Sequence, residues 1–294
     1  MNTSVKLAVS VIVAASTLAG CAPKPKPDPR LLTEAQVREL ADVGAKQFGI
    51  QWASPLNGAG EKGVAAVTDG VTTLTTHTGY RVFILHDRKE YPPTEDNAFK
   101  GSDEELKNIG LKFLKASGVQ EAEIADVQIL QQFTQLAEKS ADGKSVRLDA
   151  PQKSYRALLV SRRVDGVDAP SSRLLLNVNA AGRIAFMELN WPDVSREVRD
   201  RAALLRKVVD SGYAAPRIEG AEIESAQPVL LNSPAVGFYN DSTAAIRVIY
   251  GTNNKQVGQK AVRYIDERGV DITMPRDVDR PREEAVTRKG AAAN

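Results

Sequence analysis

Three stretches of the chain begin like amphipathic helices, and each is followed by segments in which apolar and polar residues alternate. Thr33 with Gln36, and Ser102 with Glu105, have the spacing of a capping box, whose side chains satisfy the free backbone N–H groups at a helix start. A third start lies near Ser195. Because the hydrophobic period then changes from 3.6 to 2, we expect each helix to be followed by antiparallel strands.

The alternating segments are expected to be strands, because apolar residues at every second position place one face of a strand on a core. They are residues 71–87 as a pair, 126–139, 154–164, and a hairpin that turns at 180–182. In the last strand of this hairpin, strict alternation predicts two faces: Ile184, Phe186 and Glu188 on one, and Ala185, Met187, Leu189 and Trp191 on the other.

The order of elements predicts an α+β fold made of repeated units, each with one helix packed on an antiparallel β-sheet. Gly118 and Gly212 end the second and third helices, and Gly182 and Gly269 each follow an alternating strand, although chance similarity also produces such spacings. We expect these segments: a leader at 1–20, a proline-rich linker at 21–31, α+β segments at 32–100, 101–192 and 193–274, and a disordered tail at 275–294. Whether the first α+β segment is a third repeat stays open.

The start of the chain carries one positive charge, Lys6, and then twelve apolar or small residues at 7–18. This run is too short to cross a membrane, which takes about 20 residues, and it is typical of a secretory signal peptide. It ends in Leu18-Ala19-Gly20-Cys21, which resembles the lipobox of bacterial lipoproteins, and Cys21 is the only cysteine in the chain. The alternative is an ordinary signal peptide with an incidental cysteine.

The lipobox resemblance implies cleavage between Gly20 and Cys21, a diacylglyceryl group on the Cys21 thiol and an acylated amine, which together anchor a protein stably. In residues 22–30 every second residue is proline, and such a segment favours an extended chain that rises about 3.1 Å per residue. We therefore expect a lipid-anchored, extracytoplasmic protein of the bacterial envelope. Ala22 after the cysteine favours the outer membrane in a two-membrane bacterium.

Residues 160–191 resemble the PepSY and thermolysin-propeptide-like families. The shared features are a strand, the turn Val164-Asp165-Gly166-Val167, and a second strand that ends in Asn179-Ala180-Ala181-Gly182. The chain departs from the family at Asp168, where proline is frequent. The resemblance implies small PepSY-like or cystatin-like α+β units outside the cytoplasm, which serve as propeptides that restrain metalloproteases or as modules of lipoproteins.

Few residues of the chain point to catalysis. The two histidines, His77 and His86, lie in one expected hairpin and have no carboxylate cluster nearby, so we expect ordinary strand residues and no metal site. No metalloprotease, nucleophile-elbow or phosphate-loop motif is present, and we expect no cofactor. The chain has 39 Lys and Arg, of which Lys6 leaves with the leader, against 37 Asp and Glu, a balance that argues against nucleic acid.

We expect a non-enzymatic binding or regulatory module whose partner is an envelope protein such as a peptidase, contacted or inhibited by strand addition at an exposed edge. Alternatives are a structural subunit or spacer of an envelope or surface assembly, and an enzyme with an unrecognised site. Aromatic residues in or near connecting segments are candidate partner contacts, although such residues more often close the end of a sheet: Trp52, Trp191, Phe238 and Tyr239.

Overall fold

The computed structural model describes residues 31–53, 55–61, 63–77, 81–87, 94–135, 137–139, 146–218, 221–232, 242–252 and 260–273. The expected leader and tail, together with Gly20, Cys21, Phe238 and Tyr239, lie outside the described residues. For residues 81–87 and 137–139, and for residues 146, 232, 252 and 260, the backbone alone is described.

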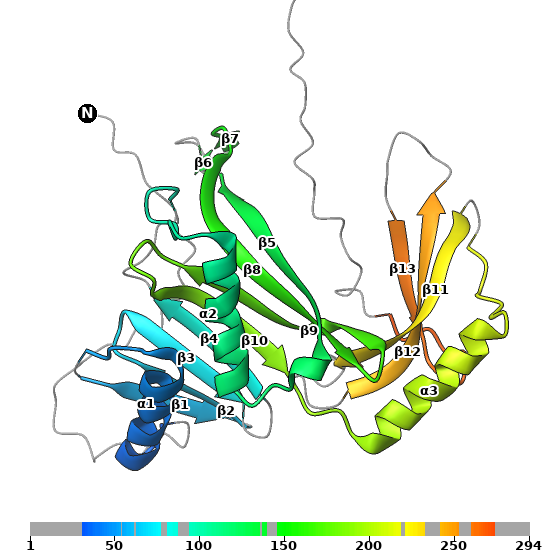
Figure 1. Ribbon diagram of the computed structural model, residues 1–294, viewed down its shortest axis with the longest axis horizontal. Coiled ribbons are helices and arrows are strands. Elements are labelled where there is room, and N and C mark those ends of the chain that lie inside the picture. Colours follow the sequence, from blue (N-terminus) through cyan, green and yellow to red (C-terminus); the bar gives the residue numbers. More distant parts are fainter. Residues whose placement is uncertain are drawn as a thin grey trace, which may run out of the picture.

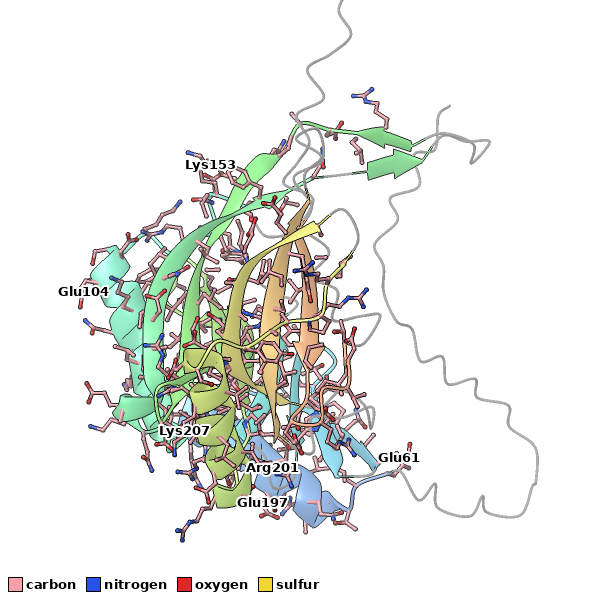
Figure 2. All side chains as sticks on the ribbon, turned by 90° about the vertical axis from the view of Figure 1, so that its right-hand side faces the viewer. Glu61, Glu104, Lys153, Glu197, Arg201 and Lys207 are labelled. Atoms are coloured by element: carbon pink, nitrogen blue, oxygen red, sulfur yellow. The ribbon has the colours of Figure 1, made fainter. Side chains whose placement is uncertain are left out.

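The three predicted helices are confirmed: α1 (Glu34–Phe48), α2 (Asp103–Ala116) and α3 (Arg196–Asp210). Both predicted capping boxes are formed, at Thr33 and Ser102, and the Ser195 side chain accepts a hydrogen bond from the backbone of Val198. Glu197 and Arg201, labelled in Figure 2, form an ion pair one turn apart along α3.

Most strands join one sheet of eleven strands, drawn in Figure 1. Along its main path the order is β1 (Asn57–Glu61), β2 (Val64–Thr68), β3 (Thr72–His77), β4 (Arg81–Asp87), β10 (Ile184–Trp191), β9 (Val167–Val178), β11 (Ala221–Asn232), β12 (Ser242–Thr252) and β13 (Lys260–Ile265). A branch leaves β9 through β8 (Gln152–Val164) to β5 (Ile124–Thr134), which follows the short 3-10 helix η2 (Glu121–Glu123). The segment predicted as one strand at 126–139 is divided, since β6 (Ala137–Lys139) pairs with β7 (Val146–Leu148) in a separate ribbon.

The predicted fold class, repeated units of one helix on an antiparallel sheet, is wrong. The described chain is mostly β and has only three α-helices. One hydrophobic core lies beneath both α1 and α2 and joins Leu40, Leu106, Leu74, Leu174 and Met187 across strands from both parts of the chain. Because α1 and α2 cover the same sheet, neither forms a unit with a sheet of its own.

Strand β9 joins the two parts of the sheet. It pairs with β10 from Arg173 onward, and where β10 ends, the start of β9 pairs in parallel with β11, with Asp168 opposite Val229. The hairpin between β8 and β9 turns at Asp165 and Gly166, which have φ values of 49° and 76°. Two positive φ angles are typical of a type I′ turn, in which Gly is strongly favoured.

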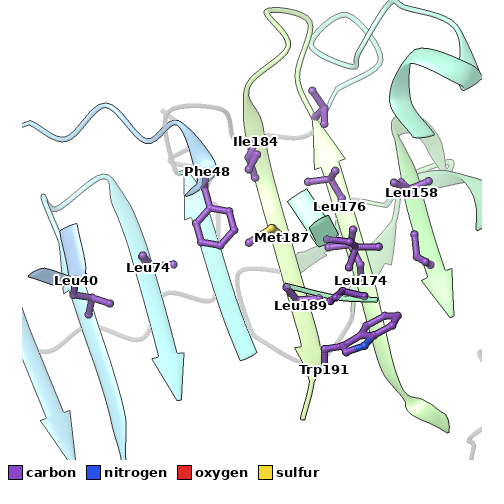
Figure 3. Packing of buried hydrophobic residues seen from close by; sticks show 14 of the residues in the cluster. Leu40, Phe48, Leu74, Leu158, Leu174, Leu176, Ile184, Met187, Leu189 and Trp191 are labelled. Carbon is purple, nitrogen blue, oxygen red and sulfur yellow. The ribbon is translucent and has the colours of Figure 1, made fainter. Parts of the chain in front are cut away.

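A β-bulge in β10 exchanges the predicted faces of Ile184 and Ala185, whereas the alternation predicted for the rest of the strand is confirmed. The register changes between Ile184 and Phe186, so that Ile184 joins Met187, Leu189 and Trp191 in the core, as Figure 3 shows. Ala185 contacts the other side of the sheet, where it packs with Ala98 and Tyr155. An extra residue in a strand moves every residue before the bulge to the opposite face of the sheet. The alternation of the sequence does not reveal the position of the bulge.

Two turns of the sheet have the same hydrogen-bond pattern with different chemistry. After β9, the Asn179 Oδ1 atom accepts from the backbone N–H groups of Ala181 and Arg183. After β13, the Asp266 Oδ1 atom accepts from the N–H groups of Arg268 and Val270, at 2.9 and 2.8 Å. Asp266 is 7% exposed. One turn therefore depends on a neutral amide and the other on a carboxylate.

We expect Asp266→Asn to remove part of the pH dependence of stability. Burial raises the pKa of Asp266, but hydrogen bonds from the Val270 N–H and from Arg268 outweigh it and hold the pKa below its ordinary value. The pKa of Asp266 is therefore lower in the folded chain than in the unfolded chain, where it is near 3.9. The ionised carboxylate stabilises the fold at pH values above 3.9, and this stabilisation is lost as the pH falls through the folded-state pKa. At neutral pH the variant should cost about 1 kcal/mol, because a charged acceptor is replaced by a neutral one.

The measurement is urea unfolding of wild type and Asp266→Asn from pH 7 down to about pH 3. The two free energies of unfolding should converge as the pH falls, because the wild-type carboxylate becomes protonated. Parallel curves over this range would contradict the assignment. Asn179→Asp is the matched control and should add acid sensitivity at the equivalent turn.

Candidate functional site

The outer edge of β5 is the strongest candidate for a site. β5 pairs with β8 on one side, and within the described residues no bridge covers its other side. The two ends of the main path are each partly covered, since Leu31 bridges Ala59 in β1 and Asp271 bridges Ile265 in β13. β5 contains no Pro, Lys or Arg, the residues that usually protect an edge from pairing with other chains.

The middle of β5, residues 126–131, runs in regular register with β8 and is bounded by a register shift on each side. The backbone N–H of Val127 donates to the Asp126 carboxylate at 2.9 Å, which means that this N–H faces away from β8. Because backbone direction alternates along a strand, Ile129 and Gln131 also direct their backbone groups outward. We call the outward backbone of residues 126–131 the β5 edge.

The two faces of β5 differ in polarity. Ile124, Val127 and Ile129 are partly buried and pack against the main core on the α2 side. Asp126 and Gln128 are exposed. A strand added to the β5 edge would therefore lie beside apolar side chains on the helix side, and on the other side beside Asp126 and Gln128 together with the partly buried Leu130.

A buried charged cluster holds the beginning of β5. The Arg162 side chain in β8 is 2% exposed, and its Nη2 atom lies 2.9 Å from Glu123 Oε2 in η2. Arg162 also donates to the backbone oxygen of Pro192, and its guanidinium lies 5.2 Å from the centre of the Trp191 ring. The Trp191 Nε1 atom donates to the same Glu123 oxygen at 2.9 Å. These contacts tie η2, β8 and the end of β10 together.

A second arginine holds the far end of the same region. Arg156 of β8 donates to the Asp103 carboxylate at 2.7 Å, to the backbone oxygen of Phe99 at 3.1 Å, and to that of Gly101. These acceptors lie at or just before the start of α2. The first turn of α2 is thereby fixed to the strand that carries β5, so the β5 edge has rigid support at both ends.

Sequence reasoning missed Arg162. Two adjacent basic residues, Arg162 and Arg163, are typical of a solvated strand face, but Arg162 is buried and only Arg163 is exposed. Its partners lie 39 and 30 residues away in the chain, at Glu123 and Pro192. A buried arginine can be found from sequence only when its partners are near in the chain, and here they are not.

The structure places the two predicted tryptophan contacts inside the fold. Trp191 is 0% exposed and belongs to the main core. Trp52 is partly buried, packs against that core, and donates from Nε1 to the backbone oxygen of Ala41 at 2.8 Å. In this conformation Trp191 contributes no surface, and Trp52 joins its connecting segment to α1.

The hairpin of β3 and β4 does not bring the two histidines together. His86 pairs with Thr73, four residues before His77 along β3, which corresponds to about 13 Å. Desolvation lowers the pKa of His77. Among the side chains that the structure describes, no three His, Cys, Asp or Glu residues gather as metal ligands would.

Within the described part of the chain, no helix is both long and apolar enough to cross a membrane. No known family model, curated protein or solved structure matches this chain. The lipobox and PepSY resemblances therefore stay predictions, and the functional argument depends on the β5 edge.

Proposed function

We propose that this chain is a lipid-anchored binding module of the bacterial envelope that holds an extended segment of a partner protein at the β5 edge. The observation that carries the proposal is the outward backbone of Val127, Ile129 and Gln131, which no other described strand pairs. In strand addition, main-chain hydrogen bonds supply affinity and alternate side chains supply specificity.

The support beneath the edge favours this function. An added strand binds best when the receiving strand is already ordered, because less conformational entropy is lost on binding. Glu123 and Arg162 fix one end of the β5 region and Arg156 fixes the other. The register shifts on either side restrict pairing to a short segment, which limits uncontrolled edge-to-edge aggregation.

Anchoring is tested with Cys21→Ser in the full-length chain, expressed in a bacterial host that is then fractionated. We expect the wild-type protein in the membrane fraction and Cys21→Ser outside it, because two or three acyl chains anchor stably and none remains in the variant. Equal distribution of the two proteins would contradict the lipid anchor.

Binding at the edge is tested in the same host by placing a photo-crosslinking residue at Gln128, which is exposed in the middle of β5. Lys207, exposed on α3 and away from β5, is the matched control position. Adducts that form from position 128 but not from position 207 support the proposal. If neither position, or both equally, form adducts, the β5 edge is not a binding site.

A further inference from the structure

We infer that the strand received by the β5 edge is β5 of a second copy of this chain, paired antiparallel about a two-fold axis at Ile129. The inference rests on the proposed function in one respect, since both use the β5 edge. It goes further by naming the partner, the direction of pairing and the register.

The backbone is compatible with this register. Val127, Ile129 and Gln131 direct their backbone groups outward, so a two-fold axis at Ile129 places Val127 opposite the second copy's Gln131 and Ile129 opposite itself. Opposed residues that both face the partner strand exchange two backbone hydrogen bonds in an antiparallel pair. A shift of the axis by half a residue would oppose outward groups to inward ones and lose these bonds.

The side chains of β5 are compatible with self-pairing. Asp126 is the only charged residue in the strand, and the axis places it opposite Gln132 rather than opposite another carboxylate. The two Ile129 side chains meet on the α2 side, next to the apolar core. Like charges directly opposite one another would destabilise the pair, and none occurs here.

Helix α2 supplies an independent argument from charge. Phe113 lies on the side of α2 that faces α1, where its ring is 6.2 Å from that of Phe48. By helical period, Glu104, Leu111 and Lys115 form a stripe on the opposite side, toward β5. Glu104 and Lys115 are both exposed, and Figure 2 shows Glu104 projecting from the helix into solvent.

The stripe of Glu104, Leu111 and Lys115 on α2 and the backbone of β5 place the two-fold axis at the same position along β5. Gly110 contacts Leu158 of β8, and Leu158 pairs with Ile129. Glu104 lies six residues before Gly110 in α2 and Lys115 five residues after it. A two-fold axis at Ile129 therefore brings Glu104 of each copy to the level of Lys115 in the other, with opposite charges facing.

The test is a charge exchange measured by sedimentation of the full mature chain with Cys21→Ser, which carries no lipid, at low ionic strength. Glu104→Lys and Lys115→Glu should each weaken the dimer about tenfold, because two symmetry-related attractions become repulsions. The double variant should restore the wild-type dissociation constant to within about threefold. Lys112→Glu, the same change at an exposed residue outside the stripe, should leave it unchanged.

Ile129→Pro tests the backbone directly, because it removes an outward N–H without removing a bond to β8, and it should abolish the dimer while the far-ultraviolet spectrum is retained. A chain that stays monomeric at all concentrations, or a double variant that does not recover, overturns the inference. If the chain is monomeric yet position 128 still forms adducts with other proteins, the proposed function stands and only the second copy is excluded. If position 128 forms no adducts at all, both fail.

Discussion

Replacing Arg162 by methionine is expected to lower the free energy of unfolding by about 3–5 kcal/mol, the cost of breaking a buried ion pair by removing one partner. Arg162 is almost fully buried and satisfies Glu123 and the backbone oxygen of Pro192. Methionine fills similar space, so the loss comes mainly from Glu123, whose side chain is 20% exposed and loses its charged partner, and from the Pro192 oxygen, which loses its donor. Urea unfolding monitored by circular dichroism measures the change.

The matched control removes both charges. Arg162→Met combined with Glu123→Gln should be more stable than the single variant by at least about 1 kcal/mol, because no partly buried charge is left without its charged partner. Glutamine still accepts from the Trp191 Nε1 atom that now donates to Glu123. A cost below about 1 kcal/mol for the single variant would show that the cluster does not hold η2 on the sheet.

The second large effect is expected from Gly110→Ala, which should destabilise the protein by about 2–3 kcal/mol through overpacking. At an exposed helix position the same change stabilises by about 1 kcal/mol, so the sign itself is informative. A Cβ atom at Gly110 would overlap the Leu158 side chain and would lie 3.5 Å from Leu174 Cδ2. Both leucines are fully buried, so α2 has to move away from the sheet.

Thermal and urea unfolding of Gly110→Ala, Leu158→Val and the double variant form a cycle that tests this contact. The double variant should recover about 1 kcal/mol or more relative to the sum of the single changes, because valine frees the space that alanine needs. Asn108→Ala, on the exposed side of α2, is the control and should change stability by no more than about 0.5 kcal/mol. A neutral or stabilising Gly110→Ala would mean that α2 does not lie so close to β8.

Both variants bear on the β5 edge because they act on its support. Arg162 holds the segment that enters β5, and Gly110 sets how closely α2 approaches the strand beside it. If α2 moves outward in Gly110→Ala, Glu104 and Lys115 move with it. We therefore expect this variant to weaken self-association as well as folding.

The sequence by itself determined the features that depend on neighbours in the chain. The capping boxes at Thr33 and Ser102 formed as predicted, because the interacting groups are three residues apart. The turn at Asp165 and Gly166 formed because few residues other than glycine accept its backbone angles. The main hairpin strands were also predicted from neighbouring residues, because alternation of apolar and polar residues shows which of them can face a core.

Only the tertiary structure decided how these elements combine. The sharing of β9 between β10 and β11, the single core beneath α1 and α2, and the burial of Arg162 all depend on pairs of residues far apart in the chain. The bulge at Ile184 and the side of β5 that no other described strand covers likewise depend on which strand lies alongside. Hydrophobic burial has no direction, so many arrangements of the same helices and strands satisfy the sequence pattern, and close packing together with complete hydrogen bonding selects one.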